Sequence, residues 1–147
     1  MPNHTTPRLI TALPDGRFIV EDRLFRAADG TFYKCEFSPT LNPTERLPQP
    51  ECVALAQACA IDPEGGAWDA PEVFELAAIA DYSRTAPAVP DELKGDISEW
   101  FYWSKTGFAS GSSYAWGALF NYGLVSANHR SSSGFVRAVR RVPASQS

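Results

Sequence analysis

The chain has 147 residues, of which 44% are apolar and 20% charged, and its net charge is −4. These proportions exclude intrinsic disorder and predict one domain over residues 1–147, because a chain of this size buries about two-thirds of its unfolded surface. No run of about 18 apolar residues occurs, and the first residues lack the apolar core of a secretory signal. We therefore expect no membrane span and a virion-associated or cytoplasmic location.

The first third of the chain has the pattern of short strands separated by turns. The predicted strands are Arg8–Leu13, Arg17–Val20, Arg23–Arg26 and Thr31–Phe37. Pro14–Gly16 and Asp29–Gly30 are turn sequences between β-rich runs, which is typical of hairpins. Residues 38–50 contain four prolines, which disfavour regular structure, so we expect a connecting loop there.

Two helices are predicted next, Pro50–Ile61 and Glu72–Tyr82. Pro50 suits the first turn of a helix, and the Asp-Pro and Gly-Gly pairs in residues 62–66 end the first helix. Apolar residues recur at helical spacing in both segments, which indicates that both helices pack on a core. Residues 84–97 are predicted to be a connector.

The C-terminal part alternates predicted strands with small-residue loops. The strands are Trp100–Ser104, Tyr114–Phe120, Leu124–Ser126 and Phe135–Val142, and the loops are Thr106–Ser113 and Ala127–Gly134. We expect these strands and the N-terminal ones to build one mixed or antiparallel sheet, which gives an α+β fold. Trp103, Trp116 and Phe135 are predicted to be core residues, because a domain of this size needs large apolar side chains. Arg137 in an apolar strand needs a buried carboxylate or carbonyl partner, so we expect it to be structural.

Charge is distributed unevenly along the chain. Residues 98–147 carry five basic side chains and one acid, whereas residues 1–97 carry eight basic and sixteen acidic ones. One interpretation is a surface for anionic partners, and the other is that the C-terminal cations pair with acids of the first part. Five cations are too few for the dense basic face of a nucleic-acid binder, so we expect no nucleic-acid partner.

The three cysteines are Cys35, Cys52 and Cys59. On one helix, Cys52 and Cys59 would lie about 10.5 Å apart, which is beyond the reach of a disulfide. A bond from Cys35 to either of the other two remains open, and so does a fold with three free thiols.

Patterns that would carry catalysis or bind a metal are weak. The only histidines are His4 and His129, and no zinc site can be recognised. Four acids gather around the helix junction, namely Asp62, Glu64, Asp69 and Glu72. They could form a calcium site, but helix capping by Asp69 and Glu72 is the simpler interpretation. A catalytic serine would have only His129 as a base, so we expect no enzyme activity and no cofactor.

Four short segments of the C-terminal third occur in a characteristic order: Tyr102–Ser104, Ser113–Trp116, Phe120–Gly123 and Phe135–Arg140. The upstream segments Asp29–Thr31, Trp68–Pro71, Glu75–Leu76 and Asp81–Ser83 extend the pattern, together with Cys35 and Cys59. This ordered set resembles the DUF1566 family, which includes the C-terminal domain of a Legionella collagen-like adhesin, over roughly residues 15–141. Ala138 stands where that family has a cysteine.

The resemblance implies a C-type-lectin-like fold, in which two helices pack on a twisted, mainly antiparallel sheet with long loops. Lectin-like folds include one class of enzyme that depends on active-site cysteines, but no cysteine follows Cys59. The leading hypothesis is therefore a non-catalytic binding module, a phage or bacterial surface domain for a protein or glycan receptor, with homo-oligomerisation left open. The alternative is a phage-encoded intracellular inhibitor that binds a host protein, and an uncharacterised enzyme is the third hypothesis.

Small polar residues interleaved with aromatic ones are typical of adaptable binding loops. The candidate ligand-binding residues are Phe108, Ser110, Ser112, Ser113, Tyr114, Asn121, Tyr122, Asn128, His129 and Arg130. Aromatic and arginine side chains most often dominate interface energies, so the expected anchors are Phe108, Tyr114, Tyr122, His129 and Arg130. The alternative is that these residues belong to plain solvated loops.

Overall fold

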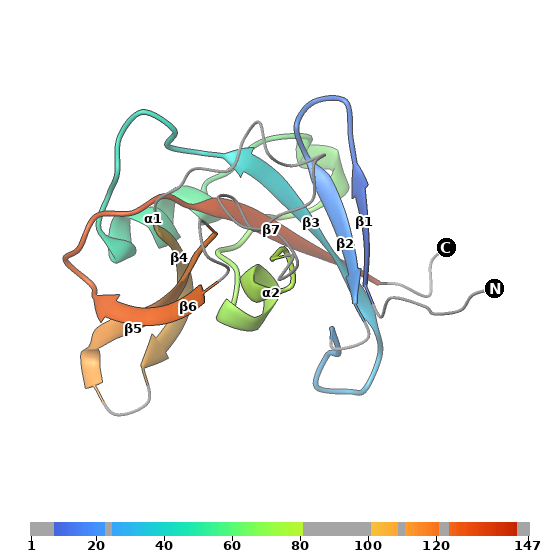
Figure 1. Ribbon diagram of the computed structural model, residues 1–147. Coiled ribbons are helices and arrows are strands. Elements are labelled where there is room, and N and C mark those ends of the chain that lie inside the picture. Colours follow the sequence, from blue (N-terminus) through green and yellow to red (C-terminus); the bar gives the residue numbers. More distant parts are fainter. Residues whose placement is uncertain (1–7, 23–24, 81–100, 109–110, 121–123, 144–147) are drawn as a thin grey trace.

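The computed structural model describes residues 8–22, 25–80, 101–108, 111–120 and 124–143 (Figure 1). Over these residues the fold combines two antiparallel sheets with two α-helices, which confirms the predicted α+β class. The predicted connector 84–97 and the end of the predicted second helix lie outside the described residues.

The first sheet joins the N-terminal strands to the last strand of the chain. Its strands are β1 (Arg8–Ala12), β2 (Phe18–Asp22), β3 (Tyr33–Thr40) and β7 (Arg137–Pro143), in the order β1-β2-β3-β7. Every neighbouring pair is antiparallel, so β1 begins and β7 ends at the same end of the sheet (Figure 1). The predicted turn between β1 and β2 is confirmed: the Leu13 N–H donates to the Arg17 carbonyl at 2.8 Å, and Gly16 has a φ of 92°.

Two predictions for this region are wrong in part. Arg26, expected to end a strand, instead forms an isolated bridge with Phe32. β3 continues through Pro39 to Thr40, where the sequence predicts a loop. The register of β3 on β7 shifts between Phe37 and Thr40, and such a bulge is a place where a strand tolerates proline.

The second sheet has three strands, β4 (Phe101–Phe108), β5 (Gly111–Leu119) and β6 (Leu124–His129), in that order. β4 and β5 extend into the predicted loop 106–113, and β6 extends into the predicted loop 127–134. Parts of both predicted loops therefore belong to hydrogen-bonded strands, and the loop prediction for those residues is wrong.

The prediction of one sheet is wrong, because β7 leaves the other C-terminal strands and pairs with β3. In this register Arg140 lies opposite Glu36, and oppositely charged cross-strand partners stabilise a sheet. A single parallel bridge between Tyr102 and Phe135 links the two sheets among the described residues. The two sheets thus meet where the chain enters β7.

The helices are shorter than predicted. α1 (Gln49–Gln57) has Pro50 in its first turn, as expected, and α2 (Val73–Ala77) follows Glu72. Beyond α1, Asp62 adopts a left-handed φ of 47° and leads into a short 3₁₀ turn, η1 (Pro63–Gly65). Beyond α2, the Ile79 N–H donates to the Leu76 carbonyl at 3.0 Å, so the chain tightens into a turn and the helix ends.

Two groups of buried side chains form the core. One surrounds Phe37, Leu76 and Tyr102, and the other surrounds Trp103 and Phe101. Trp103 is completely buried and Phe135 is 9% exposed, which confirms both as core residues. Trp116 is only half-buried, so its assignment to the core is wrong in part.

Candidate functional site

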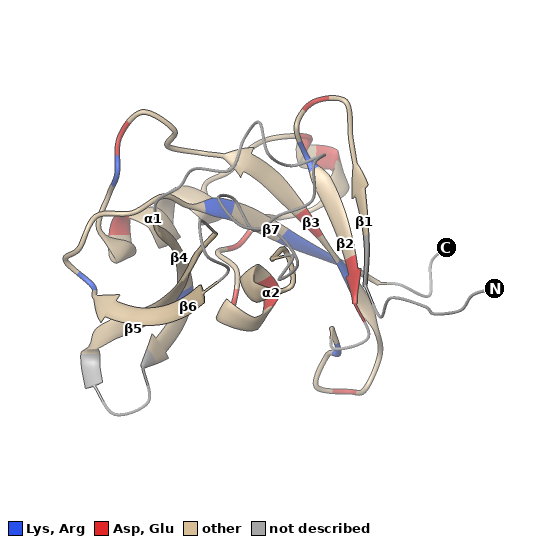
Figure 2. Cartoon of the chain, in the orientation of Figure 1, with Lys and Arg blue, Asp and Glu red and all other residues tan. Residues whose placement is uncertain are grey.

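Figure 2 shows basic positions of β7 beside acidic positions of β3 and α2. The fully buried carboxylate of Glu75 on α2 is at the centre of one such cluster. Arg141 donates to both of its oxygens, from Nε to Oε2 at 2.7 Å and from Nη2 to Oε1 at 2.8 Å. The Tyr33 hydroxyl donates to Oε2 at 2.9 Å, and the backbone N–H of Glu72 donates to Oε1 at 2.8 Å. These charge-assisted bonds hold α2 on β3 and β7.

Asp69 extends this cluster toward β4 and α1. Its Oδ2 accepts hydrogen bonds from Lys105 Nζ at 2.6 Å and from Arg141 Nη1 at 3.0 Å, and its Oδ1 accepts one from Gln57 Nε2 at 3.1 Å. Partial burial alone would raise the pKa of Asp69, but these donors outweigh it and hold the pKa well below its usual range. Asp69 therefore bridges three elements as an ionised carboxylate.

Three of the four acids around the helix junction, Asp62, Asp69 and Glu72, have polar or charged partners within the molecule. Glu72 occupies the N-cap position of α2, as expected. The prediction that Asp69 caps a helix is wrong, because its side chain pairs with Lys105 and Arg141. Asp62 pairs with Arg140. Among the described residues, no group of three or more His, Cys, Asp or Glu side chains is arranged to hold a metal ion.

A second ionic cluster surrounds Arg140, which is nearly buried. Arg140 donates from Nε and Nη2 to the two oxygens of Glu36, each at 3.1 Å, and from Nη2 to Asp62 Oδ2 at 2.6 Å. Its guanidinium also lies over the Trp68 ring, 4.4 Å from the ring centroid. This cluster fixes the η1 segment to β3 and β7, since one arginine contacts both.

The basic C-terminal part is thus largely neutralised within the molecule. Lys105, Arg140 and Arg141 all pair with acids of the first part of the chain, which confirms the interpretation of internal pairing. Arg137 is fully buried, and its Nη1 donates to the Ser38 carbonyl at 2.7 Å, so its structural role is confirmed. The cations at these positions serve the fold.

All three cysteines are free thiols. Cys35 Sγ lies 3.6 Å from Glu75 Oε2, and burial together with the Glu75 charge raises the pKa of the Cys35 thiol far above neutrality. Burial likewise raises the pKa of Cys52 to about 12. Neither thiol is ionised at neutral pH, so neither is an activated nucleophile.

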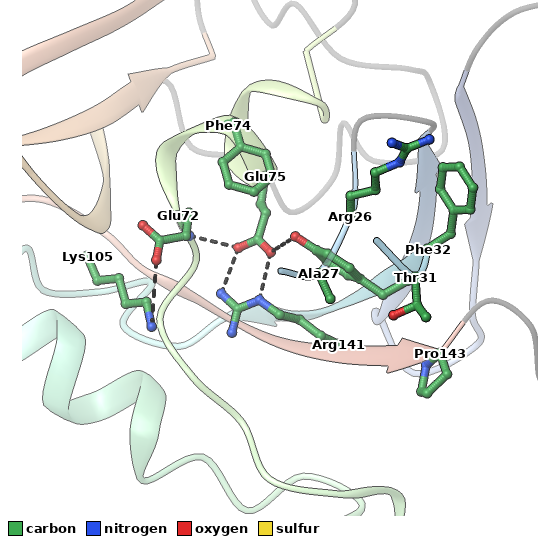
Figure 3. A pocket seen from close by; sticks show the side chains of 11 residues that line it. Arg26, Ala27, Thr31, Phe32, Glu72, Phe74, Glu75, Lys105, Arg141 and Pro143 are labelled. Carbon is green, nitrogen blue, oxygen red and sulfur yellow. Dashed lines mark hydrogen bonds and ion pairs between the residues drawn. The ribbon is translucent and has the colours of Figure 1, made fainter. Parts of the chain in front are cut away.

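A cavity of about 500 Å³ opens beside the Glu75 cluster. Figure 3 shows Phe74 of α2 on one side of it, with the paired Glu75 and Arg141 side chains below Phe74, and Phe32 on the other side. Phe32 and Phe74 are each 45% exposed, so both rings present apolar surface to the opening. Arg26 lies over the Phe32 ring, 4.7 Å from the ring centroid.

This cavity is not recognisable from the sequence. Its walls come from segments that are far apart in the chain, so no local motif marks it. Phe74 falls outside the apolar stripe formed by Val73, Leu76 and Ala77, and this break in the helical pattern is the one signal that points to it.

Part of the predicted C-terminal site comes together on one face of the second sheet. Tyr114 pairs across the strands with His129, and their rings meet edge to face with centroids 5.5 Å apart. Trp116 and Val125 share this face, because alternate residues of a strand and their direct cross-strand partners point to the same side. Tyr114 and Val125 are each 45% exposed. We call this surface, formed by Tyr114, Trp116, Val125 and His129, the Tyr114 face.

The other predicted site residues lie apart from this face. Arg130 is half-buried, and its Nη1 donates to Gln49 Oε1 at 2.8 Å, so it ties the second sheet to α1. Ser113 is exposed and neighbours Tyr114, whereas the half-buried Asn128 points to the opposite side of the sheet. Ser110, Asn121 and Tyr122 lie outside the described residues, as do the side chains of Phe108 and Ser112.

The sequence profile of the Lcl C-terminal domain matches residues 28–140, which is more than half of the chain. The chain belongs to this family. The resemblance drawn from the motif order is thereby confirmed at the level of the Lcl C-terminal domain. The matched residues span β3 to β6 and the first four residues of β7, and they include the Tyr114 face and most of the cavity wall.

Membership in the Lcl C-terminal domain family points to a surface or adhesin-like binding module. No curated protein matches the chain at a significant level. Within the part of the chain that the structure describes, no helix has the length and apolar character needed to cross a membrane.

Proposed function

We propose that the chain is a non-catalytic binding module of a phage or bacterial surface, which recognises a protein or glycan receptor through the Tyr114 face. The observation that carries the proposal is the exposure of Tyr114 and Val125 beside His129 on a hydrogen-bonded sheet. Aromatic side chains on a rigid support bind with little loss of conformational entropy. The family membership supports the same function.

The titratable groups of the core favour binding over catalysis. The Glu75 carboxylate accepts hydrogen bonds from Arg141, Tyr33 and the Glu72 backbone, which leaves it poorly placed to act as a base. Burial raises the pKa of the Cys35 thiol, which opposes a role as a nucleophile. These groups stabilise the scaffold on which the Tyr114 face is displayed.

We also propose that the chain belongs to the DUF1566 group and has a C-type-lectin-like fold. The motif residues support it, because Tyr102–Ser104 lie in β4, Ser113–Trp116 lie in β5, and most of Phe135–Arg140 lies in β7. The motif thus coincides with the strands that carry the Tyr114 face and with the strand that closes the core.

The test compares the parent chain with a Tyr114→Ala/His129→Ala double variant, each immobilised and exposed to a glycan array and to host-cell lysate. A receptor that the parent retains and the double variant loses supports the proposal. Binding on the glycan array identifies the receptor as a glycan, and capture from the lysate identifies it as a protein. Because both side chains are exposed, the double variant should keep the parent's melting temperature. Retention of the same molecules by both proteins would overturn the proposal.

A further inference from the structure

The cavity beside α2 has the size and the walls of a small-molecule site, and it is separate from the Tyr114 face. Its volume of about 500 Å³ lies within the usual range of about 300–1,000 Å³ for ligand pockets. Phe32 and Phe74 present half-exposed rings from two different segments (Figure 3). Two such rings offer flat apolar surface for a planar ligand body.

Most of the charges around the cavity already have partners. The Glu75 carboxylate is paired with Arg141, and Lys105 is paired with Asp69 at 2.6 Å. Glu72 accepts a hydrogen bond from the Thr106 hydroxyl at 2.7 Å. These polar groups satisfy one another within the protein, so none of them needs a charged ligand as a partner.

Arg26 differs from the other cations of the cavity. Its guanidinium lies over the Phe32 ring, and among the described residues no carboxylate lies within ion-pair distance of it. An arginine stacked on an aromatic face uses its flat side, which leaves the N–H donors along its edge available. Those donors match the two oxygens of a carboxylate. The cavity thus offers one exposed cation and two aromatic walls.

We propose that this cavity binds a small monocarboxylate with a flat, apolar body, such as an aromatic acid. The carboxylate pairs with the edge of the Arg26 guanidinium, and the apolar body lies against Phe74 and Phe32. A ligand with one negative charge fits because the other cations of the cavity have internal acidic partners. This binding goes beyond receptor recognition, since it uses neither Tyr114 nor His129.

The test titrates 3-phenylpropionate and its neutral counterpart 3-phenylpropanamide into the full chain and measures both affinities by ligand-observed NMR. The acid should bind at least about fivefold more tightly than the amide, because only the acid forms a charge-assisted pair with Arg26. Arg26→Gln should remove this preference, whereas Arg26→Lys should keep part of it. Phe74→Ala should weaken both probes, and Tyr114→Ala should change neither.

Thermal melting of each variant shows whether the fold is retained. Arg26 is exposed, so Arg26→Gln should melt with the parent even if Phe74→Ala, whose ring contacts Phe25 at a centroid distance of 6.2 Å, melts lower. The proposal is overturned if the acid does not bind at millimolar concentration, if acid and amide bind equally, or if Arg26→Gln leaves the preference intact. None of these outcomes bears on the receptor, which is assigned to the Tyr114 face.

Discussion

Glu75 is the single residue on which the attachment of α2 depends most. Its carboxylate is fully buried, and it receives donors from β3 and β7 as well as from the first turn of its own helix. A buried charge of this kind is tolerated because each oxygen has charged or polar partners. Removing the charge would leave Arg141 next to a neutral group in a partly buried setting.

Glu75→Gln should therefore lower the free energy of unfolding by about 3 kcal/mol or more, the usual cost of removing one partner of a buried ion pair. Urea unfolding followed by circular dichroism measures this change. The matched control is Glu64→Gln, since Glu64 is exposed on η1, and it should stay within about 0.5 kcal/mol of the parent. Equal stability of the two variants would show that the Glu75 cluster contributes little.

Asp69 predicts how stability depends on acid pH. Its folded pKa lies below the ordinary value of 3.8, so its ionised form stabilises the folded state. That contribution is fully present above pH 3.8 and is lost as the pH falls through the folded pKa. The stability difference between the parent and Asp69→Asn should therefore be constant near neutrality and shrink below pH 3.8. Urea unfolding across this range measures it, and a difference independent of pH would contradict the assignment.

At the scale of elements, local signals were sufficient for the turns and for the start of α1. The Pro14–Gly16 turn and the proline in the first turn of α1 depend on backbone preferences that neighbouring residues determine. The partner of β7 could not be predicted, because the pairing of Arg140 with Glu36 joins residues that are far apart in sequence. The second helix was predicted but its short length was not, since tertiary contacts of Glu75 hold a helix that its length alone would not stabilise.

The two tryptophans of the second sheet should respond differently to substitution. Trp103 is completely buried, so Trp103→Ala should cost about 3–5 kcal/mol of unfolding free energy. Trp116 is half-buried and lies on the Tyr114 face, so Trp116→Ala should cost clearly less and should weaken receptor binding. Thermal and urea unfolding of both variants decide this. If Trp116→Ala lowers the free energy of unfolding as much as Trp103→Ala does, Trp116 belongs to the core.

At the scale of the whole molecule, ion pairs hold the elements together, and a few exposed aromatic side chains mark the candidate binding surfaces. The basic residues of β7 pair with acids of the first part, so the charge asymmetry of the sequence does not mark a partner surface. Tyr114, Phe32 and Phe74 are instead exposed on two separate surfaces. The sequence pointed to Tyr114 and His129 because aromatic and polar residues alternate there. It missed the cavity, since Arg26, Phe32 and Phe74 meet only after folding.

The affinity of Tyr114→Ala for the receptor decides whether the Tyr114 face is the receptor site. Phe32→Ala is the matched control, because Phe32 has the same exposed fraction, 45%, but lines the cavity. Once a receptor has been retained by the parent, biolayer interferometry measures both variants against it. We expect Tyr114→Ala to lose about 2 kcal/mol or more of binding free energy, which is about thirtyfold in Kd, and Phe32→Ala to keep the parental affinity. Parental affinity of Tyr114→Ala, with loss of binding by Phe32→Ala, would instead place the receptor site at the cavity.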